Sequence, residues 1–272
     1  ERNPERKYIT LDNVQGNIAF ENVTFKYKNE SNNAVDELRI NIRPGEKVGI
    51  LGRIGSGKST MLKLASGLYD TEKGNVTLDG VDMRQLDPNF LRNQVLLFSQ
   101  SPRLFLGTLR ENMDLARTDS YSTDQDLLTA LKRFGLDQII RNHPRGLDMP
   151  LGEDGLGLSG GQKQIIALAR MTLRDPKVVL LDEPTTSLDQ GTERMALNAI
   201  AHWGRNRTML LVTHRPQVLQ IVNRIIVMEN GKVVMDGPRD LVLQKLMQNE
   251  QNKVKAAQQA QENQRPGEAA QA

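Results

Sequence analysis

One short stretch combines glycines, a lysine and hydroxyl side chains at a spacing suited to holding phosphate groups. It reads Gly52-Arg53-Ile54-Gly55-Ser56-Gly57-Lys58-Ser59-Thr60, which fits the pattern G-x-x-x-x-G-K-S/T. Glycines let the backbone N–H groups turn inward around phosphate oxygens, and a helix N-terminus adds positive potential. Lys58 would reach the β- and γ-phosphates, and the Ser59 hydroxyl would bind Mg²⁺. The stretch therefore predicts a loop that binds a nucleoside triphosphate.

The segments on either side supply the context that this motif needs. Residues 47–51 form an apolar run that predicts a buried strand, and apolar residues recur at helical spacing over 61–68. A glycine-rich turn with a chance Lys-Ser pair is the alternative interpretation. The order strand, glycine loop, helix favours the phosphate-binding loop.

A second candidate for chemistry is a pair of carboxylates, Asp182 and Glu183, that follows the apolar run 178–181. In enzymes with such a loop, an acid at a strand end holds Mg²⁺, usually through water, and Asp182 fits this role. Glu183 could polarise the water that attacks the γ-phosphate. An Asp-Glu pair after a strand can also be a helix-entry cap, but a phosphate loop in the same chain favours the catalytic interpretation.

A third stretch, Leu158-Ser159-Gly160-Gly161-Gln162, precedes an apolar helical pattern over 163–173. Ser159 and the glycines at a helix start would make a second anion-binding N-terminus. A capped helix after a glycine turn explains the same residues. Residue chemistry alone leaves both interpretations open.

Composition limits the class of protein. The 272 residues carry 36 basic and 33 acidic side chains, a net charge of +3, which gives no argument for a nucleic-acid partner, and we expect none. Without cysteine there are no disulfides or thiolate metal sites. No apolar run approaches the roughly 20 residues that a membrane helix needs.

The remaining patterns predict an α/β protein with a mostly parallel sheet core, an antiparallel β subdomain and an inserted helical subdomain. Predicted strands are 17–28 with a slip near Glu21-Asn22, 34–42, 74–80 as an edge hairpin, 93–99, 177–181, 208–212, 224–228 and 232–235. Predicted helices are 108–115, 123–134 capped by Ser122 or Thr123, 190–203 and 216–221. The predicted boundaries are a linker at 1–16, one domain at 17–247 with its helical subdomain at about 101–175, and a polar tail at 248–272, a frayed helix followed by disorder.

With its order after the phosphate loop, the stretch Leu158–Gln162 resembles the signature motif of the ATP-binding cassette (ABC) ATPases. The resemblance extends over about 17–247. In that family two cassettes pair head to tail, and the phosphate loop of one and the signature of the other enclose each ATP. The resemblance implies ATP and Mg²⁺ as ligands and a second copy of the cassette, or a related cassette, as partner. Ser159, Gly160, Gly161 and Gln162 would then contact the partner's nucleotide.

Single residues of this sequence also match the family's other functional positions. Tyr27 matches the aromatic residue that stacks on adenine, and Gln100 matches the glutamine that contacts Mg²⁺ and senses the γ-phosphate. Asp189, in Ser187-Leu188-Asp189, matches the loop that touches the opposite cassette. His214 matches the histidine that holds the γ-phosphate. The implied catalytic residues are Lys58, Glu183 and His214, and the implied metal site is Ser59, Gln100 and Asp182.

Two stretches, Leu151–Gly155 and Gln100–Asn112, resemble those of exporters. Together with Gly52–Gly55, the stretch Gln100–Asn112 looks most like bacterial type I secretion cassettes for toxins, adhesins and bacteriocins. Ser99-Gln100-Ser101 departs from the commoner Pro-Gln-Asp, and Lys163 stands where Arg is frequent; neither change removes a catalytic group. The resemblance implies membrane helices ahead of Glu1, a place at the cytoplasmic face of the bacterial inner membrane, and export of a protein or peptide. A lipid or drug exporter cassette is the alternative. A chromosome, repair or translation ATPase is disfavoured by the short separation of the motifs and by the single cassette. A regulatory cassette without turnover is disfavoured by Glu183 and His214.

Overall fold

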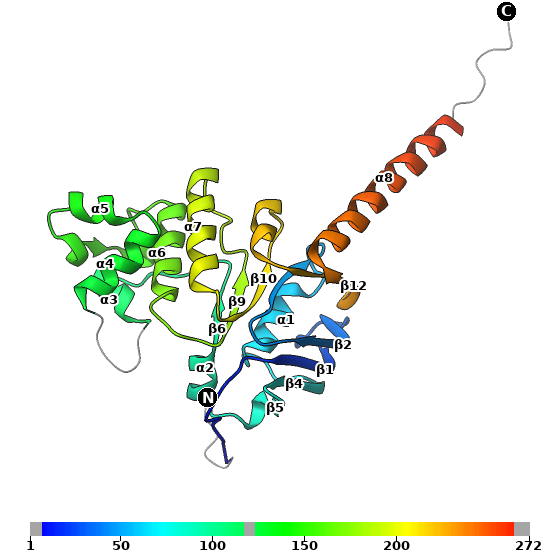
Figure 1. Ribbon diagram of the computed structural model, residues 1–272, viewed down its shortest axis with the longest axis horizontal. Helices are drawn as coiled ribbons and strands as arrows, with labels where there is room; N and C mark the ends of the chain where they lie inside the picture. Colours follow the sequence, from blue (N-terminus) through cyan, green and yellow to red (C-terminus); the bar gives the residue numbers. More distant parts are fainter. Residues whose placement is uncertain (1–6, 117–122, 264–272) are drawn as a thin grey trace, which may run out of the picture.

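The central feature of the fold is a six-stranded sheet in the order β12-β11-β3-β10-β9-β6 (Figure 1). The computed structural model describes residues 7–116 and 123–263. Neighbours from β11 to β6 pair in parallel, and β12 pairs antiparallel with β11, which confirms the predicted mostly parallel core. The strands are β3 (Lys47–Leu51), β6 (Val95–Phe98), β9 (Val178–Asp182), β10 (Thr208–Val212), β11 (Arg224–Glu229) and β12 (Lys232–Pro238).

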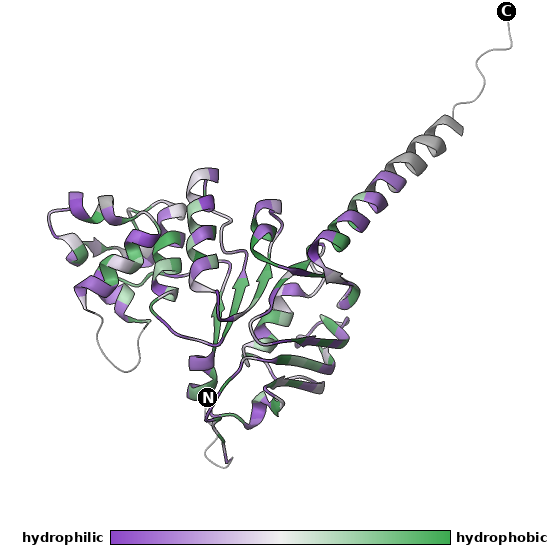
Figure 2. Ribbon diagram, viewed as in Figure 1, coloured by the Kyte–Doolittle hydropathy of each residue, from purple (hydrophilic) through white to green (hydrophobic). Residues whose placement is uncertain are grey.

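This sheet is buried on both faces. In β9, Val178 and Leu180 belong to one hydrophobic core, and Val179 and Leu181 belong to the other. Side chains alternate across a strand, so a strand covered on both sides must be apolar throughout. The central strands are accordingly green in Figure 2. One face is covered by α1 (Lys58–Ala65) and the other by α6 (Gly160–Met171) and α7 (Gln190–Trp203).

A second, antiparallel sheet has the order β2-β1-β4-β5 and shares its core with α1. Its strands are β1 (Ile18–Phe25), β2 (Val35–Ile42), β4 (Lys73–Leu78) and β5 (Val81–Asp82). The predicted slip is confirmed, since the register of β1 shifts at this point and Asn22 has a φ of 53°. The hairpin at Asp79-Gly80 is also confirmed. The prediction that the first strand of this hairpin, β4, lies at the edge of the sheet is wrong, because β5 pairs with it on its outer side. Strand β5 was not predicted because it is too short to show a pattern in the sequence.

The two helices predicted between Gln100 and Pro150 are present, each one residue shorter at both ends. Thr108 caps α3 (Leu109–Asp114) and Thr123 caps α4 (Asp124–Arg133), both through capping boxes. Ser122, the other predicted cap, lies outside the described residues. Elements that were not predicted include α2 (Pro88–Gln94), α5 (Asp137–Asn142), and the strand pair β7 (Gly107–Thr108) and β8 (Pro150–Leu151). Short 3₁₀ helices are η1 (Met83–Gln85), η2 (Gly146–Asp148), η3 (Glu153–Gly155) and η4 (Pro216–Ile221). The last of these has the bounds of the short helix predicted at 216–221.

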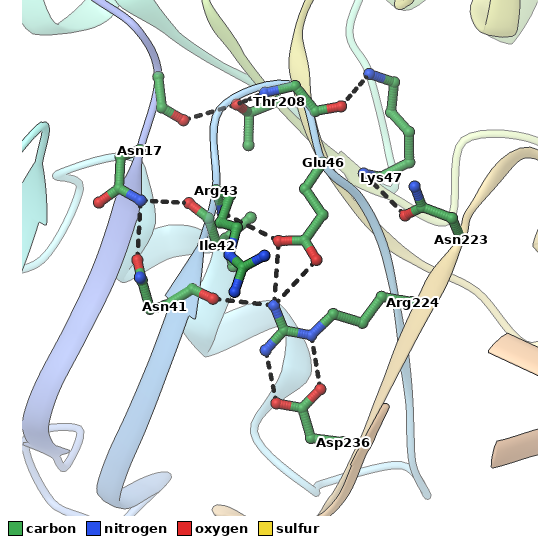
Figure 3. A network of polar contacts seen from close by, with 12 residues as sticks. Asn17, Asn41, Ile42, Arg43, Glu46, Lys47, Thr208, Asn223, Arg224 and Asp236 are labelled. Atoms are coloured by element: carbon green, nitrogen blue, oxygen red, sulfur yellow. Dashed lines mark hydrogen bonds and ion pairs between the residues drawn. The ribbon is translucent and has the colours of Figure 1, made fainter. Parts of the chain in front are cut away.

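The guanidinium group of Arg224 links the two sheets near their ends (Figure 3). Arg224 of β11 donates two hydrogen bonds to Asp236 of β12, at 2.7 and 2.6 Å. Its third nitrogen donates to Glu46, in the turn before β3, at 3.1 and 3.2 Å, and to the carbonyl oxygen of Asn41 in β2 at 2.9 Å. Paired charges with several hydrogen bonds resist movement of the groups they join.

The chain ends in a long helix, α8 (Arg239–Asn263), which projects from the rest of the fold (Figure 1). The polar tail was predicted as a helix from residue 248, but the helix begins earlier, and residues 264–272 lie outside the described part. In the coloured part of α8, hydrophilic residues predominate (Figure 2). Among the helices of residues 7–116 and 123–263, none has the length and apolar character needed to cross a membrane.

Candidate active site

The loop between β3 and α1 has a shape that only glycine allows at two positions. Gly57, the N-cap of α1, has a φ of 96°, and a Cβ added there would lie 2.2 Å from the carbonyl oxygen of Ala34. A Cβ on Gly52 would lie 2.2 Å from the carbonyl oxygen of Met228. Because glycine has no Cβ, the backbone can pass this close to its neighbours, and the loop curls just before the start of α1.

Lys58 is enclosed by this loop, with only 6% of the residue exposed. Its Nζ donates hydrogen bonds of 2.8 Å to the carbonyl oxygens of Gly52 and Arg53. Burial lowers the pKa of Lys58, while the nearby carboxylates of Glu183 and Asp182 act in the opposite direction. The loop therefore presents a cation close to the predicted acidic pair.

Asp182 and Glu183 lie at the carboxyl end of β9 and are 7% and 8% exposed. Burial raises the pKa of both carboxyls, against a hydrogen bond from Ser59 to Asp182 and the charge of His214 near Glu183. His214 Nε2 lies 3.3 Å from Glu183 Oε1, yet no described residue donates a hydrogen bond to that oxygen. The Glu183 carboxylate therefore keeps one buried oxygen whose capacity to accept a hydrogen bond is unused by the described residues.

These groups meet in one open cavity of about 600 Å³. The predicted site residues that line it are Tyr27, Ile54, Gly55, Ser56, Gly57, Lys58, Ser59, Thr60, Gln100, Asp182, Glu183 and His214. Gly52 and Arg53 contribute through the carbonyl oxygens that hold Lys58. The cavity thus unites residues from the loop after β3, from α1, from the end of β9 and from the loop after β10.

Tyr27 forms an aromatic wall of the cavity. Its hydroxyl lies 3.1 Å from Oγ1 of Thr60, at a hydrogen-bonding distance. The rings of Phe25 and Tyr69 meet it edge-on, with centroids 5.0 and 5.5 Å away. These contacts fix the plane of the ring, which leaves a face suited to stacking.

The signature residues lie elsewhere, because Ser159, Gly160, Gly161 and Gln162 are absent from the lining of this cavity. Ser159 caps α6 and exchanges hydrogen bonds with Gln162 in a capping box. Asp189 also lies outside the cavity and caps α7, and hydrogen bonds from Thr192 and Gly191 lower its pKa. Within this one chain Ser159 and Asp189 act as the N-caps of α6 and α7.

Sequence reasoning missed part of the cavity wall. Glu30, Asn32 and Asn33 line it from the loop between β1 and β2. The only available signal was their position directly after Tyr27, in an asparagine-rich run. No local pattern relates that run to the phosphate loop, so the contact emerges only from the fold.

The donor set of the cavity fits a triphosphate and Mg²⁺. A Cβ on Gly52 or Gly57 would strike a neighbouring carbonyl oxygen, so only glycine allows this curl of the loop, and Lys58 supplies a positive charge inside it. Ser59, Asp182 and Gln100 offer oxygen atoms, which Mg²⁺ prefers, and Asp182 already accepts a hydrogen bond from Ser59. Fold and site together define a P-loop ATPase.

Comparison with known proteins narrows this class. The family model described as ABC transporter matches residues 35–186. The ATP-dependent lipid A-core flippase of Neisseria gonorrhoeae is 38% identical over 242 residues, 88% of this chain and 39% of the flippase. The leukotoxin translocation ATP-binding protein LktB of Pasteurella haemolytica-like sp. (strain 5943B) is 37% identical over 236 residues, 87% of this chain and 33% of that protein.

A solved structure of a bacterial Atm1-family ABC exporter with ATP bound superposes with a TM-score of 0.82 and 28% identity. The match covers 89% of this chain and 42% of that chain. The chain therefore belongs to the ABC transporter family, and it is an ATP-hydrolysing domain similar to those of exporters. It spans about two fifths or less of the length of these relatives.

Proposed function

We propose that this chain is the motor of an exporter and that two copies close head to tail around two ATP molecules. The observation that carries the proposal is that the functional motifs lie at two separate places in the chain. The cavity holds the phosphate loop, Glu183 and His214, whereas Ser159 and the signature glycines lie outside it. Each chain then offers one half of two sites, and a second copy completes both.

Within one site, each residue has a distinct task. The loop Gly52–Thr60 and Lys58 hold the phosphates through backbone N–H groups and a buried charge. The face of Tyr27 stacks on adenine. Ser59, Gln100 and Asp182 hold Mg²⁺, which when bound neutralises charge on the phosphate oxygens.

Hydrolysis depends on Glu183 and His214. Glu183 Oε1, free of hydrogen-bond donors among the described residues, accepts a proton from the attacking water. Burial raises the pKa of Glu183, which makes its carboxylate a better base than an exposed one. His214 lies beside it and holds the γ-phosphate in line with the water.

The experiment uses Glu183→Gln, which keeps the shape of the side chain and removes the base. General-base catalysis contributes about 10²–10⁴ in rate, so turnover should fall by that order while ATP affinity persists. With Mg-ATP the variant should accumulate as a dimer in gel filtration with light scattering, and ADP should return it to monomer. Adding Ser159→Arg should abolish the dimer and spare ATP binding. A Glu183→Gln chain that binds ATP yet stays monomeric at high concentration would refute head-to-tail pairing of this chain.

In the whole protein, we infer that residues 17–247 form the cassette, with its helical subdomain at about 101–175. Residues 1–16 link it to transmembrane domains at the cytoplasmic face of a bacterial inner membrane, and 248–272 form a polar tail. Support comes from the Atm1-family exporter similarity, which covers 42% of that chain.

For the cargo, we propose a protein or peptide exported by type I secretion. The 37% identity to LktB supports this, together with the exporter-like stretch Gln100–Asn112. A lipid is the second candidate, favoured by the 38% identity to a lipid A-core flippase. Deleting the gene should remove a protein or peptide from the culture medium, as measured by mass spectrometry. An unchanged medium with an altered lipid distribution between the membrane leaflets would support the lipid instead.

A further inference from the structure

The N-terminus of α6, which carries the signature, packs on the loop that follows β9 in the same chain. A Cβ added to Gly161 would lie 3.2 Å from the carbonyl oxygen of Ser187 and 3.7 Å from Cδ2 of Leu188. A Cβ on Gly160 would lie 3.7 Å from Cβ of Ser187. The two signature glycines therefore contact a loop that begins at Glu183.

One side chain joins α6 to this loop by hydrogen bonds. Gln164, in the second turn of α6, is only 2% exposed. Its Oε1 accepts a 2.8 Å hydrogen bond from the backbone N–H of Ser187, and its Nε2 donates a longer one, 3.4 Å, to the carbonyl oxygen of Glu183. The amide thus holds both ends of the segment 183–187.

Arg215, the neighbour of His214, also binds the loop that follows β9. It donates hydrogen bonds to the carbonyl oxygens of Thr186 at 2.8 Å and Leu188 at 3.2 Å. It also pairs with Glu193 of α7 at 2.9 Å, and Glu193 accepts a hydrogen bond of 2.7 Å from Thr185. The loop is therefore fixed between α6 and α7.

The backbone of Glu183 needs such support. Its φ is 49°, in the left-handed region that side chains other than glycine rarely adopt. Strain of this kind persists only where surrounding contacts hold it. The Glu183 peptide also donates its N–H to the carbonyl oxygen of Val212 at 3.0 Å. Its carbonyl oxygen accepts hydrogen bonds from the hydroxyl of Thr186 at 3.1 Å, from the N–H of Thr186 at 3.4 Å and, from the signature helix, from Gln164 at 3.4 Å.

We propose that Gln164 is a positioning residue that sets the backbone of Glu183 relative to the signature helix. The inference rests on the proposed function for the roles of Glu183 and of the signature. In a head-to-tail pair the signature faces the nucleotide of the partner, whereas Glu183 faces that of its own chain. Gln164 therefore connects a contact at one ATP site to the base of the other.

Two substitutions separate the two hydrogen bonds. Gln164→Met removes both, and a misplacement of about 1 Å can cost 10²-fold in rate, so kcat should fall by about tenfold or more with little change in KM. Gln164→Glu keeps an acceptor for Ser187 and, when ionised, lacks the donor toward the carbonyl group of Glu183. Its activity relative to wild type at the same pH should be low at about pH 8 and recover toward about pH 6, as protonation of a buried carboxyl restores the donor.

Thr172→Val is the matched control. Thr172 is also buried, at the end of α6, but its hydroxyl donates to the carbonyl oxygen of Ala169 in its own helix. This variant should keep wild-type kcat and pH dependence. Thermal melting of all variants reports the folded fraction, so rates are expressed per folded chain.

The proposal is overturned if Gln164→Met keeps wild-type kcat per folded chain, whatever its melting temperature, or if the Gln164→Glu ratio is independent of pH. A monomeric Glu183→Gln chain would reject the head-to-tail pair, while a kcat loss in Gln164→Met would still support positioning within one chain. Full hydrolysis by Glu183→Gln would reject the role of Glu183, and with it this inference.

Discussion

His214 Nε2 lies 3.3 Å from Glu183 Oε1 because two neighbouring parallel strands end together. Val212, the last residue of β10, stands opposite Asp182, the last residue of β9, in the strand register. The residues that follow each strand therefore emerge at the same edge of the sheet, where ligands of open α/β sheets bind. The pair Glu183 and His214 is placed by strand register, and a slip of one residue would separate its members.

The crowding at Gly57 leads to a matched test with Gly55. Both have positive φ, 96° and 81°, but a Cβ at Gly55 would meet nothing within 4 Å. Gly57→Ala should lower the melting temperature clearly more than Gly55→Ala and should remove most ATP affinity, because the methyl group would strike the carbonyl oxygen of Ala34. Scanning fluorimetry compares the variants. Equal melting temperatures would contradict the close approach at Gly57.

The aromatic wall predicts how the nucleotide is recognised. Truncating a stacking ring costs about 1–3 kcal/mol, so Tyr27→Ala should weaken ATP binding by about ten- to a hundredfold. Tyr27→Phe keeps the ring, loses the contact with Thr60, and should bind almost as wild type does. A stacking face does not read base edges, so GTP and ATP should bind similarly. Titration calorimetry measures these affinities, and wild-type affinity in Tyr27→Ala would place the adenine elsewhere.

The raised pKa of Glu183 predicts a gain in stability when its charge is removed. A carboxyl whose pKa is raised by burial binds its proton more tightly in the folded state, so its ionised form opposes folding above that pKa. This penalty disappears as the pH falls through the raised pKa. Without nucleotide, Glu183→Gln should melt at a higher temperature than wild type at about pH 8, and the gap should close toward about pH 5.

Glu72→Gln is the control for this measurement, because Glu72 is exposed on the surface. Scanning calorimetry should find its melting temperature unchanged at both pH values. A Glu183→Gln chain that is no more stable than wild type at the higher pH would show that ionised Glu183 does not oppose folding.

The hydrogen bonds of Arg224 predict that replacing this residue destabilises the fold. Its side chain is 20% exposed, and truncation leaves Glu46 and Asp236 without their shared partner. Arg224→Met should lower the free energy of unfolding in urea by about 1–3 kcal/mol. Arg39→Met, at an exposed arginine that bonds Asn22, should have little effect. Equal effects of the two variants would mean that the Arg224 bridge contributes little stability.

Local patterns in the sequence predicted the features that local chemistry creates. The strand, glycine loop and Lys58 are contiguous, as are β9 and its two carboxylates, and the bulge at Asn22 interrupts an alternation that is visible in the chain. Contacts between distant segments had no such signal. Gln164 meets Ser187, and Arg224 meets Glu46, only because the sheet brings their elements together. Short elements such as α2 and β5 were missed because a period cannot be recognised in so few residues.

The Arg224 bridge has a mechanical consequence. Since one guanidinium ties β2 to β11, β12 and the turn before β3, hinge motion of the antiparallel sheet against the parallel one would have to break these hydrogen bonds. Tyr27 follows the first strand of the antiparallel sheet, and Lys58 follows the phosphate loop of the parallel sheet. We therefore expect the Arg224 bridge to oppose changes in the distance between the two ends of the nucleotide cavity.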